Sequence, residues 1–350
     1  MNRPAILPEL DGLRAVAAYG IVATHVAFQT ATGSAVLERF DYFVAVFFAL
    51  SAFLLSRGGL RGGYYSRRVA RLAPAYVVCV AVVLLALPPL AGVTWGQAAA
   101  NLLLVQVYVP HSLIDGLTQM WSLCIEAAFY VVLPLYLRLD GRGRRAALAG
   151  SVVLGLAWPW AVSGISDPAV LNMQIWPPSY APWFAVGLLL AELERAGVRY
   201  AGPRWPFPVL ALPVAWVAGV IGPRGLEHPS PAEFNVRVLL GAVFAALVVA
   251  PYALGQRFVG TVLSSPVMRT LGRWSYSVFL WHMAVLYFVF PVLGVQVFSG
   301  RFMLVFAATA LASTAVAYMS YELVEVPGGR LVRQATAKQP ATMRKVEEPA

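Results

Sequence analysis

An arginine and a histidine interrupt the apolar stretch LDGLRAVAAYGIVATHVAF at residues 10–28. Arg14 and His25 are eleven positions apart, so on a helix they share one face at a separation of about 16 Å along the axis. Ionisable groups inside apolar helices are costly and are candidates for function, and histidine is the usual general base near neutral pH. Each residue also has an ordinary interpretation, as a snorkelling arginine and as a buried histidine bonded to another helix.

A carboxylate lies in a second apolar stretch, QMWSLCIEAAFYVVLPL. With the topology inferred below, Glu126 lies at a depth close to that of His25. At that depth it can orient or charge-stabilise an imidazole, or form a structural ion pair. Trp121 and Ser122 stand about one turn nearer the outer surface and are candidates to line the same cavity, although Trp121 also fits an interfacial aromatic belt.

Arginines cluster in YYSRRVARLAPAY. Arg68 and Arg71 are three residues apart and face together on a helix, with Arg67 beside them. The guanidinium fork suits phosphate oxygens, so this segment is a candidate binding site for a polyphosphate ligand. The alternative is that the arginines only orient the chain in a membrane.

The last group of candidates lies near the C-terminal end. Ser275, Tyr276 and His282 occur in LGRWSYSVFLWHMAVL, and Glu325 occurs in YELVEVP. We expect His282 to be shallower from the cytoplasm than His25. A structural ion pair with Arg14 is the favoured role for Glu325.

The composition defines the elements that must position these groups. Of the 350 residues, 59% are hydrophobic and 12% are charged, against about 25% charged in soluble domains. Apolar runs of helix length recur along the chain, which predicts an all-α fold: a polytopic membrane helical bundle of about ten transmembrane helices. The expected spans are 12–30, 40–56, 72–90, 120–138, 146–163, 181–195, 206–222, 236–252, 273–293 and 302–323.

Basic residues are distributed unequally between the loops that these spans create. With the N-terminus in the cytoplasm, 21 of the 26 Lys and Arg residues lie on the cytoplasmic side and four lie in outer loops or helix ends, with Arg14 inside a span. This asymmetry predicts that both termini are cytoplasmic. It also accounts for the net charge of +10 without nucleic acid as a partner.

The domain organisation follows from the same pattern. We expect residues 1–330 to form one integral membrane domain, and the polar residues 331–350 to form a disordered cytoplasmic tail. Cys79 and Cys124 lie in apolar runs without disulfide or metal-ligand spacing, and no metal site is predicted.

Several stretches together resemble the acyltransferase 3 family of integral membrane acyltransferases, over about residues 7–330 and in the family's order. Ala52 departs from this pattern, because the family commonly has glycine there. The stretches are LDGLRAVAAYGIVATHV (the family's Arg-x10-His), FFALSAFLLS, RRVAR (its Arg-x-x-Arg), WSLCIEAAFYVVLPL, WFAVGLLLA, LGRWSYSVFLWH and YELVEVP.

The resemblance implies transfer of an acyl group, often acetyl, from a coenzyme A thioester to a hydroxyl of a carbohydrate or a glycosylated metabolite. The catalytic base would be His25, and Arg14, Arg68 and Arg71 would contact the donor. The co-substrate would be acyl-CoA, in the first place acetyl-CoA, with no permanently bound cofactor. The protein would then be a multi-pass protein of the cytoplasmic membrane.

Combining the residues with the resemblance gives a mechanism in which His25, oriented by Glu126 or by another hydrogen-bond acceptor, deprotonates the acceptor hydroxyl, which attacks the thioester. We favour direct transfer, with Ser122 as the alternative nucleophile of an acyl-enzyme. Two rival functions stay open: a transporter or flippase that uses the buried His, Glu and Arg for proton or anion coupling, and a non-catalytic membrane scaffold.

Overall fold

A computed structural model describes residues 7–87, 92–221, 228–256 and 260–337, and within these ranges the chain forms helices and no strand. The long helices are α1 (Pro8–Gln29), α3 (Phe43–Gly58), α4 (Tyr64–Ala86), α6 (Trp121–Arg138), α7 (Gly141–Val162), α8 (Ala181–Arg195), α9 (Pro206–Val220), α10 (Pro231–Ala253), α11 (Pro266–Leu293) and α12 (Phe302–Ser320). Shorter helices are α2 (Ala35–Glu38), α5 (Trp95–Leu102) and α13 (Val326–Ala337).

Each of the ten predicted spans corresponds to one long helix. By length and composition, seven helical segments can cross a membrane. The other three long helices are α1, which carries charged residues near its start, and α8 and α9, which have 15 residues each. The predicted all-α membrane bundle is therefore confirmed, whereas the count of ten spans and the side of the termini stay predictions.

Local sequence signals explain where several helices begin. Ser230 and Glu233 form a reciprocal capping box at the start of α10, with Pro231 in its first turn. The side chains of Asp140 and Ser265 accept backbone N–H groups at the starts of α7 and α11. Such caps satisfy N–H groups that have no partner inside the helix.

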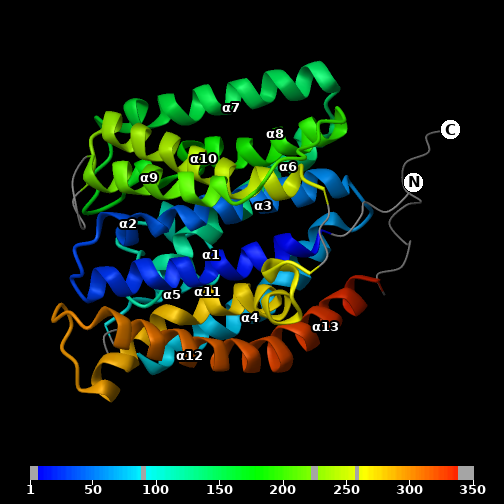
Figure 1. Cartoon of the computed structure of the whole chain (residues 1–350). Helices are drawn as coiled ribbons and strands as arrows, with labels where there is room; N and C mark the ends of the chain where they lie inside the picture. The colour runs from blue at the N-terminus through cyan, green and yellow to red at the C-terminus, as the bar shows by residue number, and fades with distance from the viewer. Residues whose placement is uncertain (1–6, 88–91, 222–227, 257–259, 338–350) are drawn as a thin grey trace.

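The helices lie side by side, with α1 in the middle of the bundle (Figure 1). On one side α1 contacts α3, which packs on α8 and α10, with α7 and α9 outside them. On the other side α1 contacts α11, which packs on α12, while α13 packs on α4. This arrangement brings α1, the helix of Arg14 and His25, between the two groups of helices.

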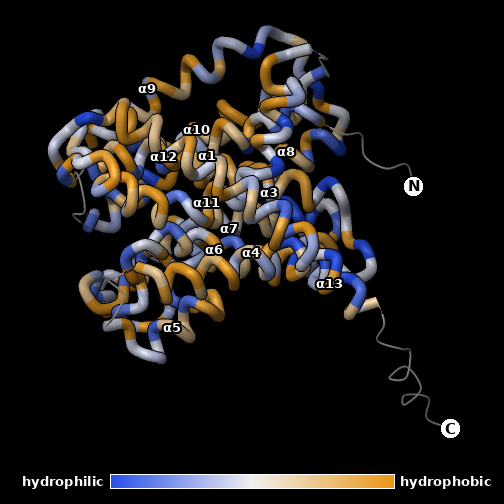
Figure 2. Tube along the Cα trace, turned by 90° about the horizontal axis from the view of Figure 1, so that it is seen from below, coloured by the Kyte–Doolittle hydropathy of each residue, from blue (hydrophilic) through white to orange (hydrophobic). Residues whose placement is uncertain are grey.

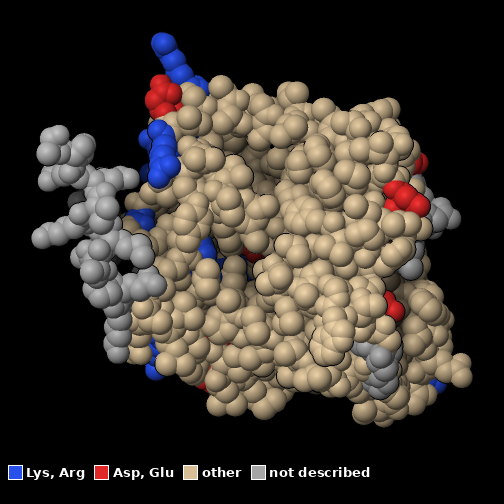
Figure 3. Space-filling view, turned by 180° about the vertical axis from the view of Figure 1, so that it is seen from behind, with Lys and Arg blue, Asp and Glu red and all other residues tan. Residues whose placement is uncertain are grey.

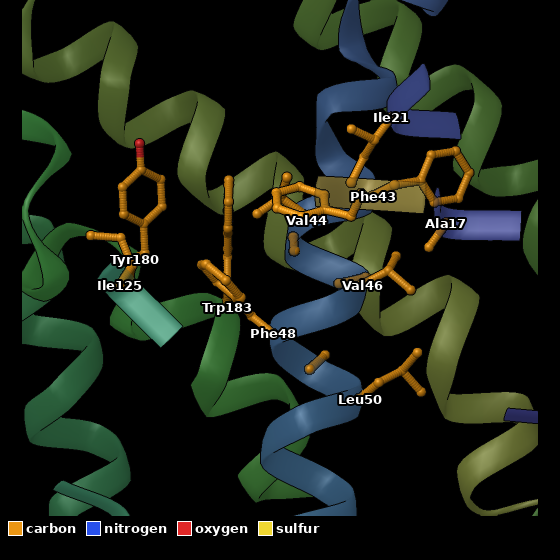
Figure 4. Packing of buried hydrophobic residues seen from close by; sticks show 14 of the residues in the cluster. Ala17, Ile21, Phe43, Val44, Val46, Phe48, Leu50, Ile125, Tyr180 and Trp183 are labelled. Carbon is orange, nitrogen blue, oxygen red and sulfur yellow. The ribbon is translucent and has the colours of Figure 1, made fainter. Parts of the chain in front are cut away.

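Aromatic side chains fill the core between α1, α3 and α8 (Figure 4). Phe48 of α3 stacks on Phe184 of α8 with a centroid distance of 4.3 Å. A side chain at Gly187 would meet Ala52 and the carbonyl of Ala49 at 2.8 and 2.0 Å. Gly187 thus allows α8 to approach α3 closely although position 52 is alanine.

The polar residues lie mainly toward the ends of the bundle. In Figure 2 the hydrophobic segments run along the helices and strongly hydrophilic segments gather near α13. The start of α1 and the end of α13 lie at the same end (Figure 1). Helix α13 continues to Ala337, so residues 331–337 of the stretch that we expected to be disordered are helical, and residues 338–350 lie outside the described residues.

Candidate active site

A cavity of about 300 Å³ lies between α1, α3, α4, α6 and α11. Its polar lining residues are Arg14, Ser51, Arg68, Arg71, Ser122, Glu126, Tyr130, Ser275 and Tyr276. Seven of these nine were candidates from the sequence, and Ser51 and Tyr130 were not. Seen from behind, the molecule has a largely uncharged face with a hollow in which basic and acidic atoms are visible (Figure 3), in keeping with this lining.

Two of the cavity's arginines form no close ion pair with a described carboxylate. Among the described residues, neither Arg14 nor Arg68 has an ion pair within 4.0 Å, and the Nε atom of each is buried without a hydrogen-bond partner. Buried polar atoms normally have partners. The cavity therefore has unused donors and positive charge, which suit an anionic ligand.

Arg71 does have a partner, and it is Glu325. The two side chains lie 3.6 Å apart, and Glu325 is 5% exposed. Ser277 also donates to this carboxylate at 3.1 Å. We expected Glu325 to pair with Arg14, and this was wrong, because a π-helical turn at Tyr321–Glu325 brings the carboxylate against α4 and α11.

Glu126 is held by two hydroxyl groups inside the cavity. Ser51 of α3 and Tyr130 of α6 each donate to its Oε1 atom at 2.5 Å. The expected contact between Glu126 and His25 is absent among the described residues. Similar depth in a membrane fixes only the height of two side chains, and Glu126 points toward α3 whereas His25 points toward α11.

The partner of His25 is another histidine. Its Nδ1 atom lies 2.9 Å from Nε2 of His282, and the His282 side chain is fully buried. Nδ1 of His282 lies 2.8 Å from the carbonyl oxygen of Phe279. Both residues were candidates from the sequence, but their contact was not foreseen.

These contacts fix the proton positions in the neutral pair. A carbonyl oxygen only accepts, so Nδ1 of His282 carries a proton and donates it to Phe279. Nε2 of His282 then has a lone pair and accepts from Nδ1–H of His25. The remaining nitrogen, Nε2 of His25, is left unprotonated, which is the form that a general base requires.

The histidine pair lies just beyond the cavity. Phe279 lines the cavity, and its ring centroid is 5.9 Å from that of His282. Phe279 thus borders both the arginine-lined space and the His282 ring.

The remaining candidates fall into two groups. Ser122 donates to the Gln119 carbonyl at 3.3 Å, Ser275 to the Gly272 carbonyl at 2.8 Å, and Tyr276 to the Leu72 carbonyl at 2.9 Å. All three line the cavity.

Arg67 and Trp121 do not line the cavity. Arg67 donates instead to the carbonyls of Gly62 and Arg61. Trp121 packs against Tyr180, with a centroid distance of 4.9 Å.

Fold and site together define a multi-pass helical membrane protein with a cationic cavity and a buried histidine pair. A family model described as an acyltransferase domain matches residues 7–322. The chain belongs to the acyltransferase 3 family.

Two relatives indicate how far the similarity reaches. Acyltransferase MdmB of Streptomyces mycarofaciens is 30% identical, over 96% of this chain and 96% of the relative. Peptidoglycan O-acetyltransferase OatA of Listeria monocytogenes is 25% identical over 92% of this chain, which spans 55% of that relative. No solved structure matches the chain significantly.

Proposed function

We propose that the protein transfers an acyl group, in the first place acetyl, from acyl-CoA to a hydroxyl of a carbohydrate or a glycosylated metabolite. The family membership supplies the acyl transfer, and the name of OatA supplies the precedent for O-acetylation. The chemistry of the site supports acyl-CoA as the donor and His25 as the base.

The donor's phosphates bind the arginines of the cavity. Arg14 and Arg68 offer unused guanidinium donors, and Arg71 stands beside them with its charge balanced by Glu325. Phosphate oxygens accept such donors in pairs. All three arginines lie near the starts of α1 and α4, which in the predicted topology face the cytoplasm, where acyl-CoA is available.

His25 acts as the general base, and His282 is a positioning residue. Because Nδ1 of His25 is engaged by His282, Nε2 is the atom that receives the proton. His282 does for His25 what a carboxylate does in a catalytic triad: it fixes the ring's tautomer and orientation. This role replaces the one that we expected of Glu126.

The transfer step balances without a cofactor. Nε2 of His25 removes the proton of the acceptor hydroxyl as its oxygen forms a bond to the thioester carbonyl carbon. The carbon–sulfur bond breaks, and the CoA thiolate takes the proton from His25. The products are an ester and CoA with a free thiol.

Glu126 balances part of the cavity's positive charge and orients Tyr130 and Ser51. Ser122 donates to the Gln119 carbonyl, and in the described part of the chain it has no hydrogen bond to a histidine or a carboxylate, which favours direct transfer over an acyl-enzyme on this serine. The protein lies in the cytoplasmic membrane, which it crosses ten times, with both termini in the cytoplasm.

The observation that carries the proposal is the contact between Nδ1 of His25 and Nε2 of His282, next to a cavity in which Arg14 and Arg68 form no ion pair with a described residue. The test uses purified full-length protein in nanodiscs with acetyl-CoA and a panel of carbohydrate and macrolide acceptors. We expect acceptor-dependent release of free thiol together with an acetylated product by mass spectrometry. Thiol release with no acylated product from any acceptor, or no turnover at all, would contradict it and favour the transporter alternative.

A further inference from the structure

We propose that a second cavity, at the opposite end of the bundle, binds a neutral sugar ring of the acceptor. This inference rests on the proposed function for its place in the reaction. The cavity has a volume of about 210 Å³ and lies between the 3-10 turn Arg39–Tyr42, the 3-10 turn Met173–Ile175 and the starts of α8 and α10. These starts lie away from the end that carries α13 (Figure 1).

The size of the cavity limits its ligand. Typical small-molecule sites measure roughly 300–1,000 Å³, so a cavity of about 210 Å³ is small and accommodates one ring rather than a whole oligosaccharide. A single monosaccharide unit of a larger acceptor matches this space.

Aromatic rings form part of its wall. Tyr180 lies 4.8 Å from Trp183 and 5.9 Å from Phe234, measured between ring centroids, and Tyr42 lies 6.4 Å from Trp183. The indole is fixed, because its Nε1 donates to the Val238 carbonyl at 2.8 Å. Rigid aromatic faces with partial negative charge suit the C–H face of a pyranose ring.

Polar atoms without partners complete the cavity. Arg39 is 6% exposed and Tyr42 is 1% exposed. The Nε atom of Arg39, the hydroxyl of Tyr42 and the Oδ1 atom of Asp41 are buried with no hydrogen-bond partner. Buried polar atoms in native proteins are nearly always paired, so three orphans around one cavity point to a polar ligand.

These polar groups without hydrogen-bond partners also define the ligand's chemistry. The guanidinium only donates, the carboxylate only accepts, and the tyrosine does both. Arg39 and Asp41 lie 3.3 Å apart and form an ion pair, and Arg237 also lines the cavity, so its wall carries two guanidinium groups and one carboxylate. The guanidinium groups need acceptors and the Asp41 carboxylate needs a donor; adjacent hydroxyl groups supply both, whereas a fully ionised phosphate supplies no donor. A polyol ring therefore fits better than an anion.

The cavity lies close to the proposed base without containing it. The hydroxyl of Thr24, the residue before His25, donates to the carbonyl of Glu38 at 3.0 Å, and Glu38 directly precedes Arg39. His25 does not line the cavity, so the bound ring is not the one that reacts.

Trp183 lines the second cavity and packs against a residue that lines the first. Its ring lies 6.0 Å from Phe48, which lines the arginine-rich cavity. Figure 4 shows Trp183 between Tyr180 and Phe48. A sugar held against Trp183 would thus position a neighbouring unit of the acceptor.

Saturation-transfer NMR on the full-length protein in nanodiscs tests this site, with neutral methyl glycopyranosides as probes and inorganic phosphate as the anionic competitor. We expect at least one glycoside to bind and phosphate not to displace it. The variants Asp41→Asn, Tyr42→Phe and Asn172→Ala, the last at an asparagine that also lines the cavity, should weaken that binding at least tenfold. Tyr318→Phe, an exposed tyrosine on α12, is the matched control.

Tyr42→Phe separates binding from a structural role. If the hydroxyl only packs, its removal leaves glycoside binding unchanged and the melting temperature equal or higher, and the proposal fails. It also fails if no glycoside binds to the folded wild type, or if phosphate displaces the glycoside. CoA binding and thiol release are measured separately, so loss of the proposed acyl transfer with glycoside binding intact would overturn the function and leave the sugar site standing.

Discussion

Nδ1 of His25 lies 2.9 Å from Nε2 of His282, across two helices that are adjacent in the bundle and far apart in the chain. Since the other nitrogen of His282 is committed to the Phe279 carbonyl, the pair has a defined direction. The hydrogen bonds run from His25 to His282 and on to the backbone of α11. Nε2 of His25 is the free basic atom.

Replacing His282 should lower kcat more than it weakens substrate binding. In His282→Phe, His25 loses the acceptor that selects its tautomer, and we expect kcat to fall about 100-fold, within the range of general-base effects. His282→Gln, whose amide oxygen can accept the same hydrogen bond, should retain more activity. Steady-state kinetics with a thiol reporter measure both variants. Equal losses in the two variants, with melting temperatures unchanged, would argue against positioning.

Arg68 and Arg67 form a matched pair of neighbours, one lining the cavity and one outside it. Arg68→Gln should raise KM for acetyl-CoA about tenfold or more, because a hydrogen bond to a charged group contributes about 1.5–3 kcal/mol. Arg67→Gln should leave this KM within about twofold. Titration with CoA by calorimetry provides an independent readout. A larger effect of the Arg67 variant on KM would indicate that the donor binds outside the cavity.

Glu126→Gln removes a negative charge beside the arginines of the cavity. The amide oxygen still accepts from Tyr130 or Ser51, so we expect the protein to fold and kcat to fall less than in His282→Phe. KM for the anionic donor should decrease by a few fold. If kcat instead collapses as it does on loss of His25, then Glu126 acts in proton transfer after all.

The membrane topology is testable with single cysteines. In a variant without Cys79 and Cys124, which are both buried, a cysteine is introduced at Asp115 or at Arg142, both exposed. We expect a membrane-impermeant maleimide to label position 115 in intact cells and position 142 only after lysis. Labelling of both from outside would contradict the ten-span arrangement.

The helices were predictable because the hydrophobic runs are continuous and nearly as long as the helices themselves. Two arginines of the cavity were also predictable from their spacing, since Arg68 and Arg71 share a helical face. Residue type alone could not distinguish Arg67 from these two arginines. Each residue along a helix turns the side chain by about 100°, and this rotation takes Arg67 out of the cavity.

The sequence alone could not predict which ionisable residues contact one another. His25 and His282 are separated by 257 positions, and loop charges fix helix direction without fixing which helices touch. Glu126 was assigned to the wrong partner for this reason. The pair Glu126 and Tyr130, four residues apart on α6, was the one contact that helical spacing alone could have suggested.

The most direct test of the central claim is acetyl transfer by His25→Gln, measured as acceptor-dependent thiol release and acetylated product in the same reaction. We expect kcat to fall about 100-fold to 10,000-fold, with CoA binding and melting temperature close to wild type. A folded His25→Gln protein that binds CoA and transfers acetyl at the wild-type rate would contradict it.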